Sequence, residues 1–238
     1  MLPYIEIGDM RISTYYSAMV LGYVLMIVLM VLKHRQKKYG IGSIKAVLFA
    51  TAQLICGVLG CKILFILENI AWVQKNGLTL GGFSFFGAVF LSPLLMPLVG
   101  RLLGMKLRDS LDCSAICILA MLGTIRVGCF LNGCCGGEVF NIGEYYFTLP
   151  TQLIECIFDF VLLVHLIKQD KKGTANGLLY PKFILFYSGA RFFIEFLRNT
   201  VKDWMYLSHA QWFSIVAIII SIVLFIALRK RKKIARKW

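Results

Sequence analysis

Long apolar runs recur along the whole chain and limit what it can fold into. Each run is roughly 20 residues long, enough for a helix to cross the ~30 Å hydrocarbon core of a bilayer. A soluble domain of 238 residues can hide one or two such runs in its core but not seven. Hydrophobic residues make up 59% of the chain, above the share in soluble domains. The sequence therefore predicts a polytopic membrane protein rather than the alternative, a large soluble helical bundle.

We expect an all-α fold with about seven transmembrane helices in a single membrane domain, residues 1–238. A small outward-facing loop region near residues 132–149, rich in glycine and polar residues, separates the fourth span from the fifth. Irregular backbone is tolerated beside lipid only where protein or water satisfies it, so this loop is a candidate functional region. The expected spans are 13–32, 44–68, 81–100, 110–131, 150–167, 178–198 and 209–228.

The positive charge predicts the orientation. The net charge of +14 is concentrated at alternate loops, in residues 33–45, 101–108, 168–182 and 229–237. Loops rich in lysine and arginine beside spans stay on the cytoplasmic side, where anionic lipids attract them. We therefore expect a multi-pass membrane protein with its N-terminus outside and its C-terminus in the cytoplasm. Nucleic acid is not an expected partner, and the N-terminus lacks the features of a cleavable signal peptide.

Charged residues inside the expected spans mark a candidate site. A charge at the bilayer centre costs at least about 2.5–3.5 kcal/mol, so such residues usually face a polar cavity. Arg126 lies in the fourth span. Four polar residues of the sixth span share one helix face because they are four, four and three residues apart: Tyr187, Arg191, Glu195 and Arg198. A purely structural Arg191–Glu195 pair would leave the other two unexplained.

The fourth and fifth spans supply possible partners. Gln152, Glu155 and Asp159 share one face of the fifth span, where a structural ion-pair role and a catalytic role both remain open. In GTIRVGCFLNGCCGGE, Arg126 precedes Asn132 and several glycines, whose backbone N–H groups can approach a ligand. Arginine beside such a turn favours an anion, and in a membrane the obvious anion is a phospholipid headgroup.

Four segments, taken in chain order, together resemble the motifs of the bacterial prolipoprotein diacylglyceryl transferases. They are GGFSFFGAVF, GTIRVGCFLNGCCGG, PTQLIE and RFFIEFLR. ISTYYSAMVLGY and SHAQWFS extend the resemblance to the first and last spans, so it covers nearly the whole chain. It implies transfer of a diacylglyceryl group from phosphatidylglycerol to the lipobox cysteine of a prolipoprotein signal peptide, without a cofactor. Arg126 and Arg191, with Glu195, would be catalytic. The implied substrate-binding residues are Tyr16, Asn132, Gly137, Glu155, Tyr187 and Arg198.

The chain departs from the family pattern at several positions. Phe86 stands where the family has a histidine, so a base at that position is absent, and His209 is the one histidine expected near the outer face. Cys129 and Cys134 replace an asparagine and a glutamate, and Cys135 is added. Three local thiols do not match a zinc-ribbon pattern, and no metal is expected. A divergent member doing thiol–disulfide or metal chemistry through these cysteines is the alternative function; a transporter is less favoured.

Overall fold

The computed structural model describes residues 2–7, 10–35, 42–77, 82–142, 145–173, 177–200 and 205–234. Within these ranges the chain forms eight α-helices, one short 3-10 helix and two β-hairpins, so the fold is all-α in its framework. The helices are α1 Thr14–Arg35, α2 Ser43–Glu68, α3 Ile70–Asn76, α4 Phe86–Leu102, α5 Leu107–Asn132, α6 Thr151–Lys171, α7 Leu179–Ile194, η1 Glu195–Leu197 and α8 His209–Ile234.

Length and hydropathy identify this chain as a membrane protein. Among the described residues, α1, α2, α5 and α8 are long and apolar enough to cross a bilayer, and α4 is apolar but only 17 residues long. α6 and α7 carry charged residues of the candidate site predicted above, among them Glu155 and Arg191, and these lower the mean hydropathy of both helices. Every predicted span contains one long helix, while hydropathy alone supports four to five of them as spans.

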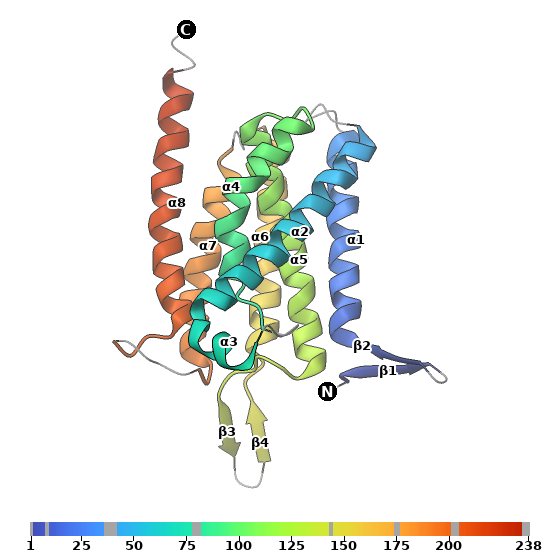
Figure 1. Ribbon diagram of the computed structural model, residues 1–238, viewed down its shortest axis with the longest axis vertical. Coiled ribbons are helices and arrows are strands. Elements are labelled where there is room, and N and C mark those ends of the chain that lie inside the picture. Colours follow the sequence, from blue (N-terminus) through green and yellow to red (C-terminus); the bar gives the residue numbers. More distant parts are fainter. Residues whose placement is uncertain are drawn as a thin grey trace.

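α5 is the central helix. It packs against α1, α4, α6 and α7, whereas α8 packs mainly on α7 (Figure 1). Small residues allow the close approach to α1: a Cβ on Gly128 would lie 2.7 Å from the Ala18 Cβ. The N-terminal hairpin and the C-terminal end of α8 lie at opposite ends of the bundle.

α2 and α4 cross in direct backbone contact. A Cβ on Gly60 would overlap the Gly87 carbonyl, and a Cβ on Gly87 would overlap that of Gly60. Only glycine permits this separation, as in other close helix crossings in membranes. The crossing also fixes the start of α4, where Phe86 packs into the core.

Two β-hairpins were not predicted. β1 Tyr4–Ile7 pairs with β2 Met10–Ser13, and β3 Val139–Ile142 pairs with β4 Tyr145–Thr148, both antiparallel. The second hairpin projects from the end of the bundle where α5 ends and α6 begins (Figure 1). Gly137 N–H donates to the Leu149 carbonyl at 2.9 Å, which closes the base of this hairpin. The described part of the α5–α6 connection is therefore hydrogen-bonded β-structure rather than irregular backbone.

The opposite end of the bundle is held by buried polar contacts. The Asp112 carboxylate accepts the backbone N–H groups of Gly177 and Leu179 at 2.7 and 2.8 Å, which caps the start of α7. A buried Lys33–Asp170 ion pair joins α1 to α6. Together these contacts fix the positions of α6 and α7, and hence of the charged side chains that they carry at the other end.

Candidate active site

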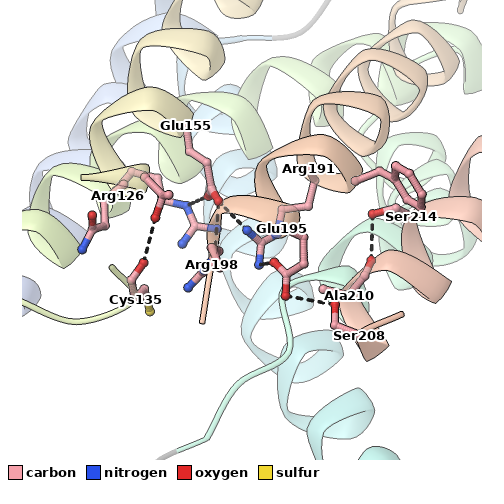
Figure 2. Close-up of polar contacts among 12 residues, drawn as sticks. Arg126, Cys135, Glu155, Arg191, Glu195, Arg198, Ser208, Ala210 and Ser214 are labelled. Carbon is pink, nitrogen blue, oxygen red and sulfur yellow. Dashed lines mark hydrogen bonds and ion pairs between the residues drawn. The ribbon is translucent and has the colours of Figure 1, made fainter. Parts of the chain in front are cut away.

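A buried cluster of arginines and glutamates joins α5, α6 and α7 near the hairpin end of the bundle. Glu155 on α6 is 3% exposed and forms ion pairs with Arg126 of α5 and Arg191 of α7. Its carboxylate also lies 3.5 Å from a guanidinium nitrogen of Arg198, just after η1. Figure 2 shows these three arginines directed at the one carboxylate. Residues 72 positions apart in the sequence thus meet at one point.

Arg191 connects this centre to a second carboxylate. One terminal nitrogen of Arg191 contacts Glu155, and the other lies 2.8 Å from Glu195 (Figure 2). The Ser208 hydroxyl donates to Glu195 at 3.0 Å. Two fixed carboxylates orient the guanidinium plane, because each engages a different nitrogen.

Ser208 was missed from the sequence. It caps α8: its hydroxyl accepts the Gln211 N–H at 3.3 Å, and the Gln211 side chain accepts the Ser208 N–H at 2.9 Å. This reciprocal arrangement is a capping box, and the SHAQ segment before an apolar run is its sequence signal. The same hydroxyl that starts α8 therefore also holds Glu195.

The ion-paired groups leave positive charge for an anion. Three guanidinium groups share two carboxylates, and all five side chains are at most 11% exposed. The ion pairs of Arg126 and Arg198 each use one nitrogen, so further N–H donors are available for a ligand. Buried charge without a partner is costly. With the neighbouring Asp159 in its neutral form, the cluster carries one surplus positive charge, which a singly charged phosphodiester matches in charge and in hydrogen-bond geometry.

Two further polar groups lie buried beside the cluster. Tyr187 is 2% exposed, and within the described ranges its hydroxyl has no hydrogen-bond partner. Both carboxylate oxygens of Asp159 are likewise without one among those residues. A buried polar group left unsatisfied costs roughly 1–3 kcal/mol. Their accumulation here indicates a place where a polar ligand completes the bonding.

The segment after α5 is held against the first turn of α6. The Gln152 side-chain amide donates to the Cys134 carbonyl at 2.6 Å, and the Thr151 hydroxyl donates to the Cys135 carbonyl at 3.3 Å. Gly133 and Cys135 both adopt left-handed backbone, with φ of 73° and 62°. For Cys135 this conformation is unfavourable and is maintained by its surroundings.

Three thiols converge at this segment. The sulfur atoms of Cys129, Cys134 and Cys135 all lie within 4.8 Å of one another. Cys129 is buried at the end of α5, while Cys135 is exposed. A hydrogen bond from the Cys129 thiol, with Arg198 and Arg126 nearby, holds the pKa of the Cys135 thiol below its ordinary value.

The remaining predicted site residues lie outside the arginine cluster. Asn132 is exposed at the end of α5, and Tyr16 is 68% exposed on α1. Tyr15, the half-buried neighbour of Tyr16, lies near Cys129, Cys134 and Cys135. Gly137 is buried, and a Cβ there would lie 2.6 Å from the Leu197 carbonyl, so it is needed for packing. The structure thus gathers only part of the predicted set: Arg126, Glu155, Tyr187, Arg191, Glu195 and Arg198.

The two positions that bear on a catalytic base are also placed. Phe86 is buried and packs against the Tyr187 ring at a centroid distance of 6.2 Å, beside the cluster. An aromatic hydrocarbon therefore stands at the position matched to the family's histidine. His209 is exposed at the first residue of α8, adjacent to Ser208.

Comparison with known proteins connects this site to a described family. A family model described as prolipoprotein diacylglyceryl transferase matches residues 3–227. A protein of Clostridium tetani named phosphatidylglycerol–prolipoprotein diacylglyceryl transferase is 29% identical, over 96% of this chain and 98% of the relative. Proteins with the same activity in their names are 28% identical in Clostridium perfringens, over 92% of both chains, and 26% identical in Clostridium kluyveri, over 96% of both.

Proposed function

The chain belongs to the prolipoprotein diacylglyceryl transferase family, and from this premise we propose that phosphatidylglycerol is its donor and a lipobox cysteine its acceptor. As a member it is a diacylglyceryl transferase. The acceptor thiol loses its proton to solvent, its sulfur bonds to the terminal carbon of the diacylglyceryl group, the carbon–oxygen bond to phosphate breaks, and glycerol phosphate leaves with the electron pair. The convergence of three arginines on Glu155 is the observation that carries this proposal.

Arg126 and Arg191 act on the phosphate. As the carbon–oxygen bond breaks, negative charge grows on the leaving group, and fixed guanidinium groups in a dry site stabilise that charge. Glu155 and Glu195 keep the guanidinium planes in place before the lipid binds, so little reorganisation is needed during the reaction. Arg198 adds a third positive charge, and the Tyr187 hydroxyl, which has no hydrogen-bond partner among the described residues, donates to a phosphate oxygen.

The site lies at the outer side of the membrane in this proposal. The chain forms one membrane domain of seven spans in the bacterial plasma membrane, with its N-terminus outside and its basic C-terminus in the cytoplasm. The end of α5 and the start of α6 then face outward, together with the arginine cluster, whose side chains come from the end of α5, the start of α6 and the end of α7. Phosphatidylglycerol headgroups of the outer leaflet and the cysteine of an exported prolipoprotein both reach that level.

Three predicted residues contribute less directly. Asn132 and Tyr16 are exposed and contact the substrates from outside the buried arginine cluster. Gly137 acts through packing, because its lack of a side chain lets the segment that carries Arg198 approach α6.

A defined transfer assay tests the function. The purified full chain is incubated with phosphatidylglycerol vesicles and a lipobox peptide, and mass spectrometry is expected to show the addition of one diacylglyceryl group to the peptide cysteine. Arg126→Ala and Arg191→Ala are expected to abolish transfer while the protein still inserts and folds. Arg11→Ala, which removes an exposed arginine of β2, is the matched control and keeps activity. Near-normal transfer by both cluster variants would refute the phosphate-binding role.

A further inference from the structure

The reaction needs a thiolate, and the arginine cluster does not supply one. A free cysteine thiol with a pKa of about 8.5 is only about 3% ionised at pH 7. Phe86 removes the base that the family motif carries at that position, and its ring lies against Tyr187 inside the site. Three thiols converge on the other side of the cluster, where Figure 2 shows Cys135 beside Arg126.

We propose that Cys129, Cys134 and Cys135 bind a zinc ion whose open fourth position takes the acceptor cysteine of the prolipoprotein. This inference rests on the proposed transferase function and assigns the activation of its nucleophile. It differs from the alternative function, in which a divergent member uses these cysteines for thiol–disulfide or metal chemistry in place of the transfer, because here the metal acts in the transfer itself.

The sulfur geometry suits zinc. Zinc–sulfur bonds of about 2.3 Å in a tetrahedron place sulfur atoms roughly 3.8 Å apart. The three sulfurs here already lie within 4.8 Å of one another, so small side-chain rotations complete the set. Structural zinc sites use four protein ligands, whereas catalytic sites use three and leave one position open. Three local thiols are therefore too few for a structural site and sufficient for a catalytic one.

The backbone holds this arrangement in place. Cys135 has left-handed φ of 62°, a conformation that non-glycine residues adopt rarely and mostly at functional sites. Thr151 and Gln152 from the first turn of α6 bind the carbonyls of Cys135 and Cys134 and maintain the turn. The same helix turn leads directly to Glu155, so the sulfur ligands and the arginine cluster share one support.

Exposure and charge also agree with an open zinc site. Cys129 is 4% exposed and Cys135 is exposed, so the cluster opens toward the outside, where the acceptor arrives. Three thiolates and one Zn²⁺ carry a net charge of −1. The one surplus positive charge of the arginine cluster offsets this charge before the phosphodiester binds.

The step balances without any other reactant than water. The acceptor thiol binds zinc as a thiolate, and its proton passes to solvent. The zinc-bound sulfur attacks the terminal carbon of the diacylglyceryl group, and the phosphate oxygen leaves with the electron pair, held by the arginines. The product is a neutral thioether, which is a weaker ligand than a thiolate and leaves the metal.

Metal binding is tested apart from activity. The purified full chain, first treated with chelator, is expected to take up one zinc per chain and, with Co²⁺ instead, to show the visible absorption of tetrahedral sulfur coordination. Cys129→Ser and Cys135→Ser should lose both, while Cys61→Ser on α2 keeps both. A lipobox peptide should raise the sulfur-to-cobalt absorption by about one third, from three thiolates to four, and its serine analogue should not. Failure of wild-type protein to bind the metal, or a Cys129–Cys135 disulfide in active protein, overturns the proposal.

Activity separates this inference from the function on which it rests. Removing zinc, or Cys135→Ser, should slow transfer by about 30-fold at pH 7, and the loss should shrink as pH rises and the free thiol ionises. Arg126→Ala should lose transfer at every pH and still bind cobalt. Full transfer by a metal-free Cys135→Ser protein refutes the zinc role and leaves the transferase function intact. Full transfer by Arg126→Ala refutes the phosphate-binding role of that arginine and leaves the metal site intact, whereas no transfer by zinc-loaded wild-type protein refutes the function.

Discussion

Glu155→Gln is the most informative single substitution, because Glu155 contacts all three arginines of the cluster. The change keeps the shape of the side chain and one hydrogen-bond acceptor but removes the charge. Of the three buried guanidinium groups, only Arg191 then keeps one of the ion pairs seen among the described residues, that with Glu195. Breaking a buried ion pair by removing one partner costs about 3–5 kcal/mol, and the retained amide acceptor favours the lower value.

The expected effect is large enough to measure in detergent solution. For a chain of this size, 1 kcal/mol corresponds to about 2–4 °C in the midpoint of thermal unfolding, so a loss of about 3 kcal/mol lowers it by roughly 6–12 °C. Transfer to the lipobox peptide should fall at least about 10-fold, because the arginines lose their orientation. Glu6→Gln, at an exposed ion pair with Arg11, is the matched control and should leave both quantities unchanged. A Glu155→Gln protein as stable and active as wild type would show that Glu155 does not organise the arginines.

Three further predictions concern the same site. Arg126→Lys should lower transfer about 10-fold with little change in unfolding midpoint, because an ammonium group cannot form two parallel bonds to phosphate; equal rates in the assay would contradict this. Tyr187→Phe should raise stability by about 1–3 kcal/mol, because it removes a buried hydroxyl without a hydrogen-bond partner among the described residues, and lower transfer about 10-fold; a loss of stability without loss of rate would point to a structural role. Gly137→Ala should cost about 1–3 kcal/mol and slow transfer, because its Cβ meets the Leu197 carbonyl and Thr151, whereas Gly42→Ala, with open space around it, should change neither.

The helical framework was largely predictable from sequence. Within lipid the backbone N–H and C=O groups of an apolar run find no water to bind. They form hydrogen bonds within the run instead, so each run becomes a helix. The differences lie at the ends: α4 begins at Phe86 rather than residue 81, because Gly82 has a positive φ and the residues after it are not helical. The sixth predicted span ends in the tighter turn η1 at Glu195–Leu197. The β3–β4 hairpin escaped prediction because the side chains of its strands whose burial is described, at 139–141 and 146–148, are all exposed and impose no alternation.

The site was predictable only in part. Helical spacing placed Arg191, Glu195 and Arg198 on one stripe, and the structure brings these three residues together with Arg126. Spacing within one helix cannot reveal which partner from another helix stands at the centre, so the role of Glu155 as a shared partner required tertiary structure. The convergence of the cysteine sulfurs depends on the left-handed backbone conformation of Cys135. The periodicity of helices and strands in a sequence does not predict such a conformation.

The glycine crossing of α2 and α4 bears on how the lipid moves. A diacylglyceryl group has two long acyl tails, and these must travel sideways from the bilayer while the headgroup reaches the arginines. Where Gly60 and Gly87 touch through their backbones, no tail can slip between the two helices. An apolar hollow lined by Gly60, Gly87 and neighbouring side chains of the same two helices lies beside this contact, so the crossing blocks passage between the helices at one level and leaves an apolar surface on which an acyl tail can rest.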